Sequence, residues 1–293
     1  MKTTLGVDIG GTKIQLSRIE PDYSVSFLKK IPTALMRRGT PAFASDLADL
    51  IRANMPLSAT GVAVSLNGAL NGGLVVYSSL MGGRVDFDLQ DALTRKLGLP
   101  VHVDDDIHAM TVAEARLGVG KQTSSFAMLN LGTGIGVGGY DDRVIRGRFG
   151  AGLISEQIIY VHELGEYRSL DRVTCGRGLR ELYFALTGRY VEAVNIFDMA
   201  KANDESAVKV LEIFSRCLAV ALGMISKFYH PEVIVINGSI KRAAGQYLDA
   251  AEKHYRSLIG EIYQAKIAVS NLDFAAEIGV ALQGAASFNE GTK

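Results

Sequence analysis

The stretch Asp8-Ile9-Gly10-Gly11-Thr12-Lys13 decides the fold of this chain. Apolar residues precede it and an alternating pattern follows at 14–19, so we predict two β-strands joined by a tight Gly-Gly turn. Backbone N–H groups in such a turn are bare, because glycine has no Cβ to block an approaching anion. Thr12 adds a hydroxyl donor and Lys13 a cation, which suits a polyphosphate. Asp8 ends the first strand, where it can hold a hydrated Mg²⁺. An ordinary hairpin is the alternative for this turn alone.

A second turn of this kind follows about one domain length later. Gly132-Thr133-Gly134 stands between the apolar strand 126–129 and a strand that leads through Val137 to Tyr140. Two such turns favour a duplicated domain. No G-x-x-x-x-G-K-[ST] motif occurs in the sequence. The pattern is therefore that of the actin-like sugar kinases and not of a Walker-type P-loop.

The composition excludes several classes of protein. The 293 residues are 48% hydrophobic, which is enough for two modest cores. Lys plus Arg and Asp plus Glu each number 31, and this balance argues against nucleic acid as the main partner. Cys175 and Cys217 are too few for a disulfide framework. The chain opens directly into a strand, with no apolar run near the ~20 residues of a membrane span, so we expect a cytoplasmic protein without a membrane partner.

Strands alternate with helices along the chain, which predicts α/β layers. The expected strands span 3–9, 13–20, 25–30, 61–64, 100–104, 126–129 and 233–236. The expected helices span 42–54, 91–97, 109–117, 178–186, 205–229, 247–258 and 275–287. We predict loops over 67–73 and over most of 147–171, and an N-cap at Asp106.

Asp104, Asp105 and Asp106 form a run of three carboxylates between a strand and a helix. Adjacent acids repel one another, so we expect one of them to lie at a substrate hydroxyl or a metal. A solvated acidic helix start is the alternative. Beside two phosphate turns, such a carboxylate can accept a hydroxyl proton while that oxygen attacks a γ-phosphate.

Five segments in this order resemble the ROK family of sugar kinases and sugar-responsive repressors. They are Asp8–Lys13 and Leu131–Gly136, similar to its phosphate motifs; Pro100–Glu114, similar to P-V-x-V-x-N-D-A-N-A-A-x-x-x-E; Val173–Leu179, similar to S-G-R-G-[IL]; and Pro231–Ser239, similar to D-P-x-x-I-V-I-G-G-[GS]. The resemblance covers nearly the whole chain. It implies an α/β fold of two actin-like (ribonuclease H-like) domains around an interdomain cleft. We expect the first domain at 1–115 plus a C-terminal helix at about 275–293, and the larger second domain at 116–274.

The resemblance also implies site residues. It places the catalytic base on Asp106 and the adenosine at Gly238 and Ser239. The expected contacts to the ATP phosphates are Gly10, Gly11, Thr12, Lys13, Gly132, Thr133 and Gly134. The expected acceptor contacts are Asn67, Gly68, Asp105 and Glu156, and Asp8 is expected to bind Mg²⁺ through water. Kinases of this kind are often homodimers, and we expect one here.

The departures from the family pattern fall on the sugar side. Asp105 stands where the family has Asn, and Leu80 where it has Asn before a Gly-[GW] turn. An Asp in place of Asn loses two N–H donors and gains a charge, which suits a cationic amino substituent or a hydroxyl. Glu156 alone remains of the Glu-x-Gly-His element. Residues 165–173 contain no Cys, so we expect no structural zinc.

These residues predict an ATP-dependent carbohydrate kinase that phosphorylates a hydroxyl of a hexose, amino sugar or related polyol. A catalytically inactive sugar sensor is the alternative, motivated by the incomplete Glu-x-Gly-His element. The retained Asp8, Asp106 and both phosphate turns weigh against it. Family repressors carry a DNA-binding extension before the first phosphate motif, whereas here only Met1–Leu5 stands ahead of it, which favours the kinase branch.

Overall fold

The computed structural model describes residues 2–148 and 150–290, which form two compact units. The first unit contains the chain up to Leu117, the segment Val144–Ala151 and the chain from Leu272 on. The second contains Gly118–Arg143 and Gly152–Asn271. Residues 144–151, which the predicted boundaries assign to the second domain, thus cluster with the first unit. Residues 291–293 of the predicted C-terminal helix lie outside the described residues.

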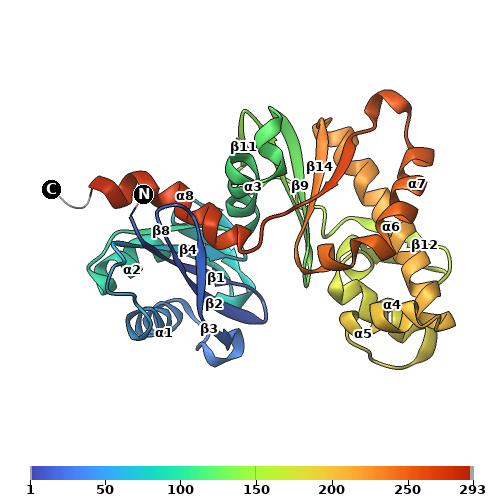
Figure 1. Ribbon diagram of the computed structural model, residues 1–293. Coiled ribbons are helices and arrows are strands. Elements are labelled where there is room, and N and C mark those ends of the chain that lie inside the picture. Colours follow the sequence, from blue (N-terminus) through green and yellow to red (C-terminus); the bar gives the residue numbers. More distant parts are fainter. Residues whose placement is uncertain (1, 149, 291–293) are drawn as a thin grey trace. The chain divides into compact units, whose positions relative to one another are not determined.

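The sheet of the first unit has the strand order β3-β2-β1-β4-β8 (Figure 1). Its strands are β1 (Thr4–Ile9), β2 (Lys13–Ile19), β3 (Val25–Pro32), β4 (Gly61–Leu66) and β8 (Val101–Asp105). The first three form antiparallel hairpins, whereas β1, β4 and β8 are parallel. The predicted strands of this region are confirmed. Because β1, β4 and β8 are parallel, their carboxyl ends meet at one edge of the sheet.

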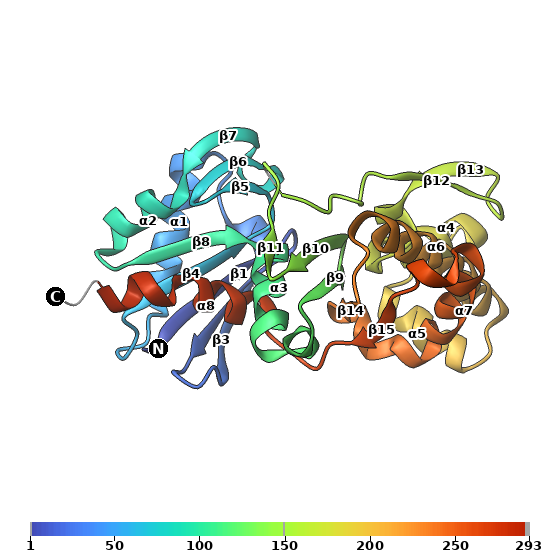
Figure 2. The ribbon, with the colours of Figure 1, turned by 90° about the horizontal axis from the view of Figure 1, so that it is seen from above.

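Helices cover both faces of this sheet (Figure 2). On one face, α1 (Thr40–Ala53) and α2 (Leu89–Leu97) pack through residues such as Phe43 and Leu93 against Val7 and the other core residues of β1. On the other face, α3 (Asp106–Leu117) and α8 (Ala275–Glu290) lie side by side. The two-residue period of β1 therefore turns Asp8 toward the face covered by α8, away from the apolar core.

A small sheet corrects one prediction. Its strands are β5 (Ala69–Asn71), β6 (Leu74–Ser78) and β7 (Gly83–Asp88). The Gly-rich segment 67–73, predicted as a loop, thus contains a strand. Gly72 and Gly73 form the two-residue turn of the β5–β6 hairpin, and Gly72 has a φ of +59°, which glycine adopts without strain.

The second sheet repeats the topology of the first. Its order is β11-β10-β9-β14-β15. Its strands are β9 (Ser125–Leu131), β10 (Ile135–Asp141), β11 (Arg143–Ile145), β14 (Val233–Asn237) and β15 (Lys266–Val269). The central strand β9 is antiparallel to β10 and parallel to β14, as β1 is to β2 and β4. The two Gly-rich turns therefore do lie at equivalent places in two similar sheets.

The second unit is richer in helix. Its helices are α4 (Gly176–Thr187), α5 (Ala193–Lys201), α6 (Glu205–Tyr229) and α7 (Leu248–Leu258), which share one apolar core with the sheet. The hairpin of β12 (Ile158–Val161) and β13 (Glu166–Ser169) lies in the region predicted as loop. Helix α5 was not predicted from the sequence. Its N-cap residue, Glu192, is not a residue type that marks a helix start, and its side chain makes no capping hydrogen bond.

Short 3₁₀ turns connect these elements, at Thr33–Leu35, Ser79–Met81, Val119–Gln122, Leu170–Arg172, Ser239–Gln246 and Glu261–Tyr263. Within residues 2–148 and 150–290, every helix is too short or too polar to cross a lipid bilayer.

Candidate functional site

The first Gly-Gly turn is held by hydrogen bonds and faces solvent. The N–H of Gly10 donates to Lys13 O at 3.0 Å and closes the turn. Thr33 braces it from outside, because its hydroxyl donates to Gly10 O at 2.8 Å and its N–H to Thr12 O at 3.1 Å. Gly11, Thr12 and Lys13 are exposed, and a Cβ built on Gly11 would meet no atom within 4 Å. The turn is thus open to an anion.

A polar row crosses the sheet beside this turn. Asp8 and Ser65 are register partners on β1 and β4, and Ser65 and Asp104 are partners on β4 and β8. The Ser65 hydroxyl donates to Asp8 Oδ1 at 2.9 Å. Burial raises the pKa of Asp8, and the bond from Ser65 and the charge of Lys13 partly offset this rise. The neighbouring protein groups therefore do not fully compensate the negative charge of the Asp8 carboxylate.

Asp106 lies at the same edge, as the first residue of α3. Asn67 Nδ2 donates to its Oδ2 at 3.4 Å, and the N–H of Ile107 donates to its Oδ1 at 3.1 Å. Burial raises the pKa of Asp106 to about 7, with further contributions from the charges of Asp105 and Asp8. A carboxyl with such a pKa is poised to accept a proton near neutral pH.

The loop that follows β4 reaches this carboxyl. The backbone N–H of Asn67 donates to Ile9 O at 3.1 Å, which ties the loop to the end of β1. A Cβ on Gly68 would lie 2.6 Å from Tyr77 O, so the close approach of β6 requires glycine there. The structure therefore brings together Asp8, Asn67 and Asp106 from separate parts of the sequence.

Asp105 caps α3, and this corrects the prediction that Asp106 would. Asp105 Oδ1 accepts the N–H of His108 at 2.7 Å, the bond expected of an N-cap side chain. Asp106 follows as the first helical residue. Its acidic side chain there is favourable to the helix dipole, so the sequence pattern alone did not distinguish the two positions.

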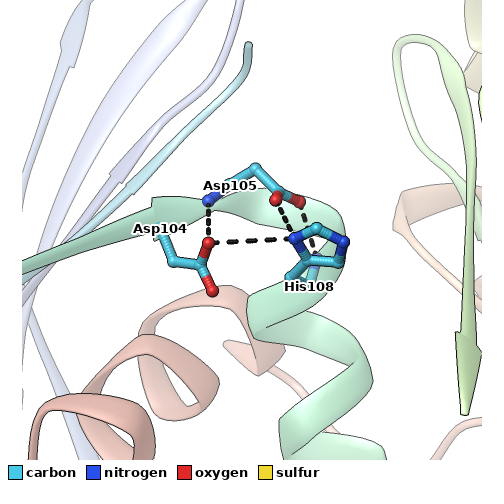
Figure 3. Close-up of side chains that lie close together, drawn as sticks. All are labelled: Asp104, Asp105 and His108. Atoms are coloured by element: carbon cyan, nitrogen blue, oxygen red, sulfur yellow. Dashed lines mark hydrogen bonds and ion pairs between the residues drawn. The ribbon is translucent and has the colours of Figure 1, made fainter. Parts of the chain in front are cut away.

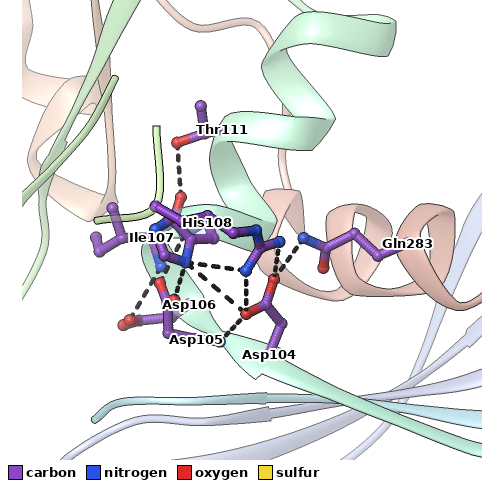
Figure 4. A network of polar contacts seen from close by, with 8 residues as sticks. Asp104, Asp105, Asp106, Ile107, His108, Thr111 and Gln283 are labelled. Carbon is purple, nitrogen blue, oxygen red and sulfur yellow. Dashed lines mark hydrogen bonds and ion pairs between the residues drawn. The ribbon is translucent and has the colours of Figure 1, made fainter. Parts of the chain in front are cut away.

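Three buried charged side chains, Asp104, Asp105 and His108, form a network next to Asp106, and the exposed Arg146 joins it (Figures 3 and 4). His108 Nδ1 is ion-paired with Asp105 Oδ2 and lies 3.8 Å from Asp104 Oδ1. Arg146 donates to both oxygens of Asp104, at 2.9 and 2.6 Å, and Gln283 donates to Asp104 Oδ2 at 2.5 Å. Burial alone would raise the pKa of Asp104, but His108 and Arg146 hold it well below its usual range.

Asp104, Asp105 and His108 have one donor atom each within 4.8 Å of one another, a spacing that a metal ion can bridge. Arg146 and Gln283 already donate hydrogen bonds to the Asp104 carboxylate, and His108 is already ion-paired with Asp105. A cation added here would displace existing ion pairs, so we assign this cluster to the salt-bridge network.

Glu277 of α8 is a buried carboxyl that the sequence did not single out. Gln15 Nε2 donates to its Oε1 at 2.8 Å. Burial, followed by the charge of Asp8, raises the pKa of Glu277 to about 7. Gln15 is the register partner of Asp8 on β2, so Glu277 adds negative potential beside Asp8.

The second Gly-rich turn, in the second unit, is closed by the N–H of Gly132, which donates to Gly134 O at 3.0 Å. Asp171 Oδ1 accepts the N–H of Ile135 at 3.1 Å, and a Cβ on Gly134 would lie 2.8 Å from the same oxygen. Asp171 therefore supports the turn from one side, and a side chain at position 134 would require the Asp171 carboxylate to move.

Helix α4 begins at this turn. The N–H of Gly176 donates to Gly132 O at 2.9 Å, and the N–H of Arg177 donates to Thr133 O at 3.1 Å. Arg177 Nη1 donates to Asp171 Oδ2 at 2.6 Å. The segment 173–179, selected by resemblance, thus does lie against the second turn.

Gly238 and Ser239 follow β14, whose last residue Asn237 is the register partner of Asn130 on β9. Gly238 has a φ of +88°, and a Cβ there would lie 2.4 Å from Leu131 O. The second turn and the predicted adenosine residues therefore meet at the carboxyl ends of adjacent parallel strands, a common place for ligands in α/β sheets.

The predicted acceptor contacts are divided between the units. Asn67, Gly68 and Asp105 belong to the first unit, whereas Glu156 lies exposed in a turn of the second. Sequence reasoning missed Thr33, Arg146, Asp171 and Glu277. Each is an isolated residue whose partner is distant in sequence, so no local spacing marks it.

Known proteins resemble this chain over most of its length. The β-glucoside kinase of Listeria innocua is 29% identical over 250 residues, which cover 80% of this chain and 81% of that protein. The N-acetylmannosamine kinase of Citrobacter koseri is 26% identical over 300 residues, which cover 99% of this chain and 100% of that protein.

The crystal structure of a ROK family glucokinase from Streptomyces griseus, in complex with glucose and AMPPNP, matches with a TM-score of 0.80. It is 23% identical and covers 96% of this chain and 98% of its own. This likeness confirms the predicted fold of two actin-like α/β domains. The sequence model of the ROK family matches residues 4–288, and this chain belongs to that family.

Proposed function

We propose that this protein is an ATP-dependent kinase that phosphorylates a hydroxyl of a hexose, amino sugar or related polyol. The observation that carries the proposal is Asp106, a half-buried carboxyl with a pKa of about 7 at the strand edge that also holds Asp8 and the first Gly-Gly turn. Relatives named as kinases of sugars and amino sugars support the acceptor class.

Asp106 is the proposed general base. Its ionised carboxylate would accept the proton of the attacking hydroxyl, and the bond from Asn67 would orient the accepting oxygen. ATP supplies the phosphoryl group. Side-chain bases of this kind contribute roughly 10²–10⁴-fold to the rate.

Each unit supplies proposed contacts to the nucleotide. In the first unit, Gly10, Gly11, Thr12 and Lys13 would meet the phosphates, with the open space at Gly11 in support. In the second, the proposed phosphate contacts are Gly132, Thr133 and Gly134, and the proposed adenosine contacts are Gly238 and Ser239. We propose that the two compact units are the two functional domains of the kinase.

Asp8 is the proposed Mg²⁺ residue. Its carboxylate is half-buried, and Ser65 donates to one of its oxygens. A hard cation would compensate the negative charge, which partial burial makes unfavourable. Mg²⁺ neutralises phosphate charge when it is bound. Asp8 would hold it through water, beside the turn that ends at Lys13.

Asn67 and Gly68 are the proposed acceptor contacts next to the base, and Glu156 of the second unit is a further proposed contact. The sugar-sensing alternative is not favoured, because the relatives described above are named as kinases. A homodimer is a further proposal, made on the family resemblance alone, and a cytoplasmic location is proposed from the sequence expectation given above.

An acceptor screen tests the proposal. The wild-type protein would be mixed with ATP, Mg²⁺ and a panel of hexoses, N-acetylated and free amino sugars, β-glucosides and cyclitols, and release of ADP measured. We expect ADP release with at least one of them. Binding of ligands with no ADP release from any would contradict a kinase and favour a sensor.

A further inference from the structure

Asp105 and His108 form a closed pair at the start of α3. Asp105 Oδ1 accepts the N–H of His108 at 2.7 Å, and Asp105 Oδ2 pairs with Nδ1 of the same residue. Figure 3 shows the imidazole folded back onto the carboxylate. Asp105 is 6% exposed and His108 is 2% exposed. Both oxygens of Asp105 are therefore engaged within one turn of helix.

The charges that face His108 come from two segments, β8 and the segment that carries Arg146. Asp104 and Asp105 of β8 approach its Nδ1, and Arg146 Nη1 lies 3.3 Å from the same nitrogen. Burial alone would lower the pKa of His108, but the two carboxylates raise it to about 9. At neutral pH the network therefore holds two negative and two positive charges, and the charge of Asp105 is compensated within the protein.

The pair adjoins the proposed base. Asp105 directly precedes Asp106, and its charge is the largest contribution after burial to the raised pKa of Asp106. The charge of Asp8 on β1 also raises the pKa of Asp106, whereas the hydrogen bonds from Asn67 and from the backbone N–H of Ile107 lower it. The charge state of the pair is thus felt at the group proposed to take the proton.

We propose that Asp105 and His108 act as one positioning pair for Asp106, and that Asp105 is not a contact to the acceptor. The proposal rests on the proposed function of Asp106. His108 holds the Asp105 carboxylate away from the acceptor and balances its charge, while the cap that Asp105 places on α3 fixes the backbone that carries Asp106. An ammonium group on the acceptor then gains no ion pair from Asp105, so this residue does not select amino sugars over neutral ones.

The two members of the pair have opposite effects on the base. Without His108, the Asp105 charge stands uncompensated beside Asp106 and makes ionisation of Asp106 harder. Without the Asp105 charge, ionisation of Asp106 becomes easier. A residue that merely packs would not produce shifts of opposite sign.

The test is the titration of Asp106 in wild type, D105N, H108N and the double variant, followed by ¹³C NMR of the side-chain carboxyls and assigned with D106N. We expect the midpoint to move up in H108N and down in D105N, each by at least about half a unit, with the double variant between them. The controls D142N and H254N, in the second unit, should leave it unchanged. Single variants that shift it in the same direction, or not at all, would overturn the proposal.

Unfolding midpoints give a second readout where a single variant is poorly folded. If Asp105 and His108 are coupled, the double variant should lose less stability than the sum of the losses in the two single variants. Additive losses would contradict the pair. Neither readout needs turnover, so failure of the kinase proposal, seen as no ADP release by wild type, is distinguishable from failure of this one. In an active enzyme, the acidic limb of the pH–rate profile should follow the NMR order, and KM for a neutral acceptor should change less than kcat.

Discussion

The side-chain amide of Asn67 donates to Oδ2 of Asp106 at 3.4 Å, and so joins the loop after β4 to the first residue of α3. The backbone N–H of Asn67 donates in turn to Ile9 O at the end of β1. One residue thus connects the strand that leads into the first Gly-Gly turn with the proposed base. This connection explains how a loop can tune the ionisation of a carboxyl on another element.

Removal of the Asn67 amide should therefore raise the pKa of Asp106, because the hydrogen bond favours the ionised form. In N67A, we expect the acidic limb of kcat to move to higher pH by less than about one unit, since the bond is long. Full pH–rate profiles of wild type and N67A measure this. N71A, an exposed position on β5, is the matched control. A limb that moves to lower pH in N67A would contradict the assigned bond.

The ionised form of Asp106 should destabilise the folded protein. The pKa of Asp106 is about 7 in the folded protein against 3.8 for an ordinary Asp side chain, so folding favours the protonated form. Stability from this group is therefore present below pH 3.8 and is lost as the pH rises to about 7. D106N carries no charge and should be more stable than wild type at pH 8, on the order of 1–3 kcal/mol.

Urea unfolding at pH 8 and at pH 4 checks this prediction. The advantage of D106N should be largest at pH 8 and should shrink toward pH 4, while the exposed control D142N should change stability by less than about 0.5 kcal/mol at both values. Equal stability of D106N and wild type at pH 8 would show that the Asp106 carboxylate is adequately solvated.

Gly11 offers a variant that separates binding from folding. A Cβ there meets no atom within 4 Å, and the same is true at Gly245. We expect G11A and G245A to unfold at nearly the wild-type midpoint. G11A alone should weaken ATP binding, because its methyl group stands where the phosphates would approach the bare N–H groups. Isothermal titration calorimetry measures the affinity, and unchanged ATP binding by G11A would remove the first turn from the nucleotide site.

Arg177 should matter to nucleotide binding through Asp171. The Asp171 carboxylate lies against the second turn, where it would repel phosphate unless the guanidinium at 2.6 Å balances its charge. R177Q should weaken ATP binding about fivefold, which corresponds to roughly 1 kcal/mol of repulsion in a partly solvated site. The double variant D171N/R177Q should regain part of this loss.

R180Q is the matched control, because Arg180 lies on the same helix and pairs with Glu192 instead. Titration of all three variants with ATP distinguishes the local effect from a general loss of positive charge. Similar losses in R177Q and R180Q would assign the effect to net charge and not to the Asp171–Arg177 pair.

Local sequence patterns predicted the backbone of the site well. The apolar runs on either side of the two Gly-rich turns and the periodic spacing of 205–229 correspond to β1, β2, β9 and α6, because strand and helix periods are local properties. The two-residue hairpin at Gly72-Gly73 was missed, since a cluster of small residues reads equally as a loop.

The polar network around Asp106 was beyond such reasoning. Arg146 reaches Asp104 from 42 residues away, and Gln15 reaches Glu277 across 262 residues. Asp105 was predicted to offer its charge to the acceptor, whereas the structure pairs it with His108, a residue that no motif emphasised. Ion pairs between distant segments depend on packing, which the order of residues does not display.

The most direct test of the central claim compares wild type with D106N in the ADP-release assay, with the best acceptor from the screen, while calorimetry follows ATP binding. The account predicts that D106N loses at least about 100-fold in kcat and binds ATP within a few-fold of wild type. Near-wild-type turnover by D106N would contradict Asp106 as the general base.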